Sequence, residues 1–158
     1  MIGKKRNLGK QINMLAIGDR YKSVYRIEDK DLLLYLGLTN DANPLYIQHD
    51  YASQTSYSKP IVPSVMLCGM ISAVISMHLP GPGSHIVKQD MTYPKPVFHY
   101  TEITFVVEII SIDHANHMVE ISAVGFDEEG DEVISGKMYV CPPHKLNSLT
   151  ANSLENFF

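Results

Sequence analysis

A short stretch of the sequence places a carboxylate, an amide and a phenol close together. It reads Thr39-Asn40-Asp41-Ala42-Asn43-Pro44-Leu45-Tyr46 and follows an apolar segment. The residue before a proline is pushed out of the helical region, and Asn and Asp bond their own backbone, so this stretch must end a helix and form a turn. The bend holds these side chains in fixed positions, so the turn is a candidate site for chemistry. Asn43 either takes part in that site or braces the turn.

The composition fits one globular domain. The chain has 158 residues and a mass of 17.7 kDa, and 45% of its residues are hydrophobic, which is ordinary for a protein that buries one core. Its net charge is -4, so the protein has no overall positive electrostatic potential that would attract nucleic acid. The basic run Lys4-Lys5-Arg6 with Lys10 is predicted to be solvated, within an N-terminal arm over residues 1–14. We therefore expect no nucleic-acid partner.

Cysteine usage and hydropathy predict a cytoplasmic protein. Cys68 and Cys141 lie far apart and form no Cys-x-x-Cys, so neither a disulfide framework nor a zinc module is indicated. No apolar region follows the basic start, so a secretory signal is not expected. The longest apolar stretch, residues 65–77, contains glycine and serine and falls short of the roughly 20 residues that span a bilayer. No membrane partner is predicted.

The first half of the chain is mostly helical in pattern. Side chains of two kinds alternate along residues 20–27, which predicts a strand. Acidic residues within 28–31 then predict the first turn of a helix whose apolar part covers 32–38. A short helical segment is expected from 49 or 50 to 57. The strongest helix signal, over 65–79, is apolar on nearly all sides, so this helix must be surrounded by other structure.

The second half changes to a period of two. It predicts strands at 85–93, 102–112, 118–126 and 132–140, the last three joined by loops at 113–117 and 127–131. An apolar helix followed by a long antiparallel sheet predicts an α+β domain in which the sheet wraps around the helix. This domain is expected over 15–143. In the tail over 144–158, the two final phenylalanines dock on the domain or the segment is disordered.

A set of motifs resembles the MaoC-like family of (R)-specific enoyl-CoA hydratases and dehydratases. In chain order these are Leu15-Ala16-Ile17-Gly18-Asp19, the Asp41 turn, Tyr51-Ala52, Lys59-Pro60-Ile61-Val62, Leu79-Pro80-Gly81-Pro82-Gly83-Ser84 and Tyr93-Pro94-Lys95-Pro96-Val97. The resemblance implies a hot-dog fold, dimers, and a tunnel for an acyl thioester of coenzyme A or acyl carrier protein. It implies no organic cofactor and no metal.

The resemblance also assigns roles to single residues. The family turn normally reads Asp-x-Asn-Pro-(apolar)-His, and its Asp and His form the catalytic pair. By resemblance, Asp41 handles the water that adds to a trans-2-enoyl thioester or leaves an (R)-3-hydroxyacyl thioester. The N–H groups near Ser64 and Val65 would face the thioester carbonyl. Two positions depart from the pattern: Tyr46 replaces the His, and Pro63-Ser64 replaces a common His-Gly.

Tyr46 leaves several functions open. A phenol with a pKa near 10 mostly donates, whereas an imidazole with a pKa near 6.5 both donates and accepts near pH 7. Tyr46 therefore either serves as an acid in a hydratase with a changed rate or packs as a hydrogen-bonded aromatic, and His49 offers a nearby imidazole. The alternatives are a non-catalytic module that binds acyl thioesters and a subunit that completes a dimer with a competent relative.

Two further groups of residues are expected to have no catalytic role. Asp113-His114 with His117 lies in a predicted hairpin loop without further ligands nearby in sequence, so no metal site is expected there. Cys68 lies in the apolar helix and is predicted to be an inert thiol.

Overall fold

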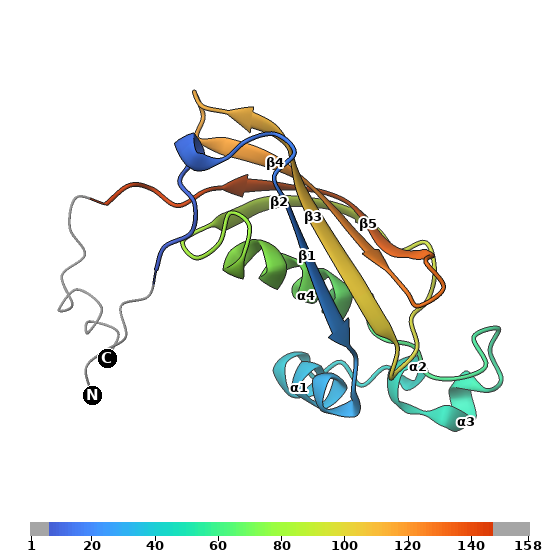
Figure 1. Cartoon of the computed structure of the whole chain (residues 1–158). Coiled ribbons are helices and arrows are strands. Elements are labelled where there is room, and N and C mark those ends of the chain that lie inside the picture. Colours follow the sequence, from blue (N-terminus) through green and yellow to red (C-terminus); the bar gives the residue numbers. More distant parts are fainter. Residues whose placement is uncertain (1–6, 147–158) are drawn as a thin grey trace, which may run out of the picture.

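The computed structural model describes residues 7–146, in which one curved antiparallel sheet packs against a central helix (Figure 1). The predicted α+β hot-dog architecture is confirmed. The elements, in chain order, are η1 Ile12–Met14, β1 Arg20–Arg26, α1 Asp29–Thr39, α2 Pro44–Ile47, α3 His49–Ala52, α4 Ser64–Met77, β2 His85–Thr92, β3 Glu102–Asp113, β4 Met118–Phe126 and β5 Glu132–Cys141. The predicted basic run at 4–6 and the tail over 147–158 lie outside the described residues.

The sheet has the order β1-β3-β4-β5-β2, with every pair antiparallel. β3, β4 and β5 form the predicted meander, because short loops join them. β2 precedes β3 in the chain but pairs with β5 at the far edge, where His85 lies opposite Cys141. The turn after α4 therefore leads the chain to the edge of the sheet opposite β1.

The core lies between the concave face of the sheet and α4. Alternate residues of β3 and β4 point inward, and Ile109, Ile121, Ile71 and Ile75 are fully buried. Burial of each such side chain contributes about 1.5–3 kcal/mol relative to leaving it exposed. The expectation that α4 is surrounded on nearly all sides is wrong for the described chain, because one flank stays open and Met77 is 60% exposed.

α1 begins and ends as its sequence requires. Glu28 and Asp31 form a capping box, in which each side chain accepts a hydrogen bond from the other residue's backbone N–H. The helix ends where Asn40 adopts a left-handed conformation with φ of 56°, which turns the chain before Asp41. The predicted end of this helix at the Asp41 turn is confirmed.

The segment after α1 differs from the prediction. Pro44 opens a short unpredicted helix, α2, and the predicted helix over 49–57 is wrong because α3 ends at Ala52. The Thr55 hydroxyl donates to the Ala52 carbonyl at 2.7 Å, and Ser58 has φ of 69°, so local side-chain bonding and a left-handed residue replace the helical continuation.

Residues 7–14 of the predicted arm lie against the turn that follows α4. The Gly9 N–H donates to the Pro82 carbonyl and the Lys10 N–H to the Pro80 carbonyl, both at 2.8 Å. A Cβ at Gly9 would fall 2.2 Å from the Pro80 oxygen, so only glycine allows this approach. Among the described helices, none has the length and apolar character needed to cross a membrane.

Candidate active site

The Asp41 carboxylate is held at the end of α1 by two donors. The Tyr35 hydroxyl donates to its Oδ2 at 2.8 Å, and the Asn43 N–H donates to its Oδ1 at 3.3 Å. The Asp41 N–H in turn donates to the Thr39 hydroxyl at 3.2 Å. Asp41 is half-buried, so its carboxylate has a defined position but remains accessible to a small molecule such as water.

Asn43 connects this carboxylate to Tyr46. Its side-chain oxygen accepts from the Leu45 N–H at 3.0 Å and caps α2, while its carbonyl accepts from the Tyr46 N–H at 2.9 Å. The structure thus brings Asp41, Asn43 and Tyr46 into one hydrogen-bonded segment. The oxygen of the Asn43 side-chain amide is bonded to the Leu45 backbone N–H. Of the two roles that the sequence left open for Asn43, this bond corresponds to bracing the turn.

Tyr35 is a site residue that the sequence analysis did not identify. Its hydrogen bond to Asp41 raises the pKa of the Tyr35 phenol above 10.0, with smaller contributions that include burial and the charge of Asp41. The hydroxyl therefore stays protonated near neutral pH and keeps donating to Asp41. A polar group in the last turns of an apolar helix, with Thr39 one turn further on, was the available signal.

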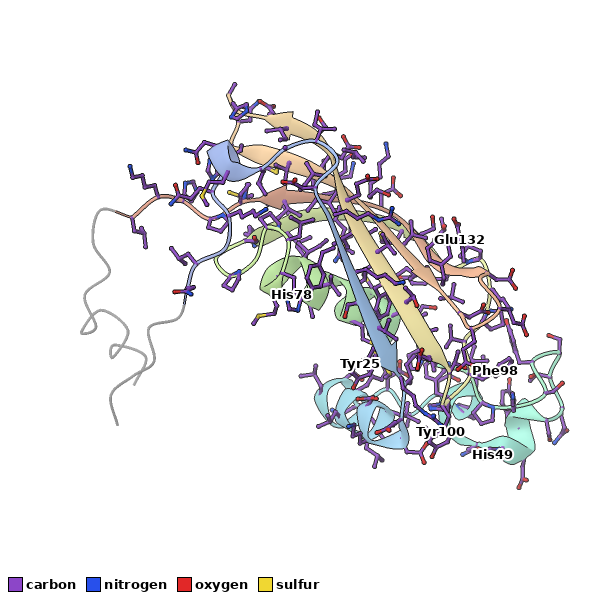
Figure 2. All side chains as sticks on the ribbon, in the orientation of Figure 1. Tyr25, His49, His78, Phe98, Tyr100 and Glu132 are labelled. Atoms are coloured by element: carbon purple, nitrogen blue, oxygen red, sulfur yellow. The ribbon has the colours of Figure 1, made fainter. Side chains whose placement is uncertain are left out.

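Tyr46 lines a pocket of about 730 Å³, here called the Tyr46 pocket, at the end of the sheet where α1, α2 and α3 gather (Figure 2). Figure 2 labels His49, Phe98 and Tyr100 in this region. The lining combines an apolar wall with several polar groups, and consists of Asp29, Leu32, Leu33, Leu36, Tyr46, Ile47, His49, Lys59, Pro60, Phe98, His99 and Tyr100.

His99 is the second residue that the sequence analysis missed. Both of its ring nitrogens are buried, and neither makes a hydrogen bond of standard geometry within residues 7–146, although the Tyr46 backbone lies close enough to favour the protonated ring. Burial lowers the pKa of His99 below 6.5, although the charge of Asp29 acts in the opposite direction, so the ring is neutral near pH 7. A neutral imidazole thus shares a pocket with the phenol that replaces the family's usual histidine. No spacing in the sequence relates position 99 to position 46.

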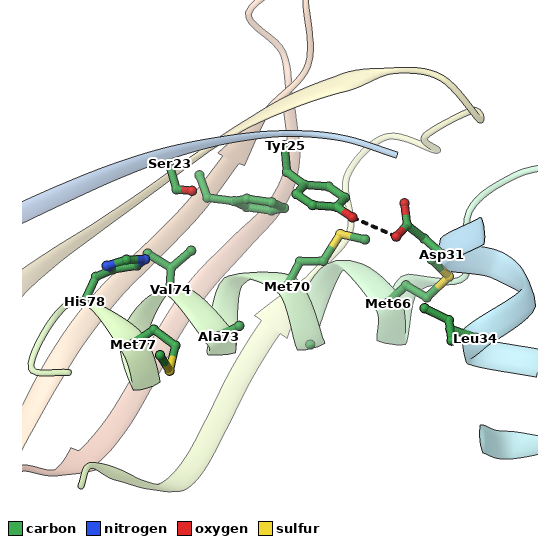
Figure 3. Close-up of a pocket in the computed structure, with 12 residues that line it drawn as sticks. Ser23, Tyr25, Asp31, Leu34, Met66, Met70, Ala73, Val74, Met77 and His78 are labelled. Atoms are coloured by element: carbon green, nitrogen blue, oxygen red, sulfur yellow. Dashed lines mark hydrogen bonds between the residues drawn. The ribbon is translucent and has the colours of Figure 1, made fainter. Parts of the chain in front are cut away.

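A second pocket of about 460 Å³ runs along the open flank of α4 (Figure 3). We call it the helix-face pocket. Met66, Met70 and Met77 line it, and their unbranched side chains adapt to ligands of different shape. The Tyr25 hydroxyl donates to Asp31 at 2.7 Å at one end, and His78 lies at the other, as Figure 3 shows.

The pockets lie against different faces of α1. Asp31 and Leu34 face the helix-face pocket, whereas Leu32 and Leu36 face the Tyr46 pocket. Tyr35 lies one helical turn after Asp31, and such pairs share a helix face. Tyr35 and Asp41 are not among the lining residues of either pocket, and the charge of nearby Tyr46 acts on the Tyr35 phenol.

Ser64 and Val65 form the exposed start of α4, and Val65 is 63% exposed. No side chain caps this end, and the Met66 N–H donates to the Pro63 carbonyl at 3.0 Å, which leaves the N–H groups of Ser64 and Val65 as the available donors of the first turn. The Ile61 N–H donates to the Leu45 carbonyl at 3.2 Å, which places the approach to α4 beside the segment from Asp41 to Tyr46. Within residues 7–146, no hydrogen bond joins Ser64 or Val65 to Asp41.

A curved antiparallel sheet around one apolar helix, with an acidic turn before that helix, defines a hot-dog domain with a candidate acid-base site. A family model described as "MaoC like domain" matches residues 4–128. That match covers most of the chain, which therefore belongs to the MaoC-like domain family.

Named relatives and solved structures agree with this assignment. The chain is 26% identical over 129 residues to an (R)-specific enoyl-CoA hydratase of Aeromonas caviae, covering 82% of this chain and 96% of that protein. It is 29% identical to a mitochondrial 3-hydroxyacyl-[acyl-carrier-protein] dehydratase of Solanum lycopersicum, covering 79% and 76%. The R-hydratase PhaJ1 of Pseudomonas aeruginosa superposes with a TM-score of 0.80 at 23% identity, covering 90% of this chain and 94% of that one.

Proposed function

We propose that this chain is an acyl-thioester hydratase or dehydratase, a lyase that interconverts a trans-2-enoyl thioester and an (R)-3-hydroxyacyl thioester. The family membership and the hydratase relatives support this reaction. The observation that carries the proposal is the Asp41 carboxylate, which the Tyr35 hydroxyl and the Asn43 N–H hold at the family's acidic turn. Because two hydrogen bonds fix the orientation of the Asp41 carboxylate, it can accept a proton from a water molecule in a defined geometry.

In the hydration direction, Asp41 accepts a proton from water while the water oxygen bonds to C3 of the enoyl chain. Electrons of the double bond then move through C2 to the thioester oxygen. The free N–H groups near Ser64 and Val65 would stabilise that oxygen. The Tyr46 hydroxyl gives a proton to C2, and the proton held by Asp41 restores the phenol through solvent. The reaction as proposed uses no metal and no organic cofactor.

We propose that the far part of the acyl chain lies in the helix-face pocket, whose walls are mainly apolar, with Met66, Met70 and Met77 along α4. C2 and C3 of the chain would lie at the turn, within reach of Asp41 and Tyr46. The thioester of either coenzyme A or acyl carrier protein would then enter beside the turn. A cytoplasmic setting belongs to this proposal and is supported by the free thiols of Cys68 and Cys141.

We also propose that the active unit is a homodimer or an assembly of dimers. The open flank of α4 exposes 63% of Val65 and 60% of Met77, and the edge strand β1 exposes 51% of Val24. A second copy would bury this apolar surface. Light scattering should give a mass of at least twice 17.7 kDa at micromolar concentration, and a monomer mass would contradict the dimer.

Tyr46 supports a second candidate, a module that binds acyl thioesters without turnover or a partner subunit. A phenol replaces the imidazole of the usual catalytic pair, and loss of such a group commonly lowers the rate by about 10²- to 10⁴-fold. Among the structural neighbours is the ChsH1-ChsH2 complex of Mycobacterium tuberculosis, a two-protein assembly, at 15% identity and a TM-score of 0.73.

Steady-state hydration of crotonyl and longer enoyl coenzyme A by the purified chain tests the proposal. We expect turnover in the wild type and a loss of about 10²-fold or more in Asp41→Asn. The amide oxygen still accepts a bond from Tyr35, so the melting temperature should change little. No turnover together with thermal stabilisation by acyl thioester would favour the binding module. If neither occurs, the partner-subunit function remains.

A further inference from the structure

Three side chains with metal-binding chemistry meet at the end of the sheet opposite α1, α2 and α3. His117 lies in the loop between β3 and β4, Cys141 is the last residue of β5, and His144 follows it in the chain. Figure 1 shows that this end is far from the helices that carry the candidate active site. One ligand atom from each residue lies within 4.8 Å of the other two.

The spacing of these atoms suits a tetrahedral ion. Cys141 Sγ and His144 Nε2 are 3.7 Å apart. Zinc bonds of about 2.3 Å to sulfur and about 2.0–2.1 Å to nitrogen, at tetrahedral angles, place the two ligand atoms roughly 3.6 Å apart. The separation of these two atoms therefore matches that of two ligands of one zinc ion.

The orientation of His117 is independent support for a metal site. Its Nε2 lies 2.9 Å from the Pro142 carbonyl oxygen. A carbonyl only accepts, so Nε2 carries the hydrogen and Nδ1 carries the lone pair. Metal-binding histidines typically donate their other ring nitrogen to a carbonyl or carboxylate in this way. The His117 ring stacks on His144, with centroids 4.0 Å apart and planes at 11°. Because an imidazole binds a metal in its own ring plane, one of the two rings has to rotate before both can bind the same ion.

We propose that His117, Cys141 and His144 bind one divalent zinc ion, with water in the fourth position. The Cys141 thiol releases its proton to solvent when the sulfur binds the ion. The ion would tie the segment after β5 to the β3–β4 loop and so stabilise this end of the sheet. The sequence analysis expected no metal site, either at residues 113–117 or at the two cysteines, because the strand pairing that brings Cys141 to His117 is not visible in the sequence.

Cobalt titration of the full-length, tag-free chain tests this site separately from any hydratase activity. Co²⁺ bound to a thiolate has a charge-transfer band in the near ultraviolet. We expect one Co²⁺ per chain with this band, and its displacement by Zn²⁺. Cys141→Ser should remove the band and weaken binding by about tenfold or more. Cys68→Ser is the matched control, because Cys68 lies on α4 beside Gln89, and it should bind like the wild type.

His144→Asn is a second test variant, in case Cys141→Ser fails to fold. His144 is exposed and lies after β5, so its replacement should leave the sheet intact. In this variant we expect weaker Co²⁺ binding and no rise in melting temperature with Zn²⁺, whereas the wild type should be stabilised. The proposal is overturned if the wild type binds neither ion at micromolar concentration. A band that survives in Cys141→Ser, or one that disappears in Cys68→Ser, would also overturn it.

Discussion

Replacing Tyr35 with phenylalanine removes one hydroxyl and leaves the rest of the site in place. The Tyr35 ring packs against the core and is kept in Tyr35→Phe. The lost bond is the 2.8 Å contact from the hydroxyl to Asp41 Oδ2, while the Asn43 N–H still reaches Oδ1. The change therefore tests whether the orientation of the carboxylate matters to the reaction.

The structure sets the size of the expected effect. A hydrogen bond to a charged group contributes about 1.5–3 kcal/mol, and the partial exposure of this pair reduces that to about 1–2 kcal/mol. If the bond positions Asp41 in the transition state, kcat/KM should fall by about 5- to 30-fold. The free energy of unfolding should fall by at most about the same 1–2 kcal/mol, which corresponds to a decrease in Tm of no more than about 2–8 °C.

The assay is the loss of ultraviolet absorbance of the conjugated enoyl thioester, followed together with thermal melting. Tyr139→Phe is a matched control. Its ring lies under Lys88, with 5.2 Å from Nζ to the ring centroid, and its neighbours Met138 and Val140 are buried, so it faces away from the core. An activity of Tyr35→Phe within twofold of the wild type would refute the positioning role. A large drop in Tm would show instead that the bond is structural.

Three further perturbations test other parts of the structure. Tyr46→His should raise the rate of enoyl hydration, by up to about 10²- to 10⁴-fold, because imidazole exchanges protons near neutral pH; a slower variant would mean that the phenol itself takes part. Burial lowers the pKa of the His99 ring in the folded protein, so the neutral ring makes its full contribution to folding stability above a pH of about 6.5. That contribution is lost as the pH falls from 6.5 towards the lower pKa that His99 has in the folded protein. Denaturant unfolding of His99→Phe should therefore depend less on pH below 6.5 than that of the wild type, and equal slopes would contradict this. Gly136→Ala places a Cβ 2.0 Å from the Asp90 carbonyl oxygen, so the variant should lose about 1–3 kcal/mol of stability in urea, unlike Gly37→Ala, whose Cβ meets nothing within 4 Å.

The sequence by itself determined the strands, the two longest helices and the position of the acidic turn. Strand β4 has the predicted bounds, 118–126, because alternation between core and solvent is visible within a single strand. The end of α1 and the bend at Asp41 also follow from side chains that bond within a few residues. The helix over 49–57 was the local failure, since Thr55 and its neighbours bond the backbone in a way that helical periodicity does not reveal.

Only the tertiary structure decided which distant residues meet. The pattern of β2 is the same whichever strand it pairs with, and its place beside β5 depends on the path of the turn after α4. His99 reaches the Tyr46 pocket, and Cys141 reaches His117, through the curvature and register of the assembled sheet. The open flank of α4 also depends on how far that sheet extends around the helix. The periodicity of apolar residues indicates which face of a helix or strand is buried. It does not indicate which other element packs against that face, because the same apolar face can pack against any complementary surface.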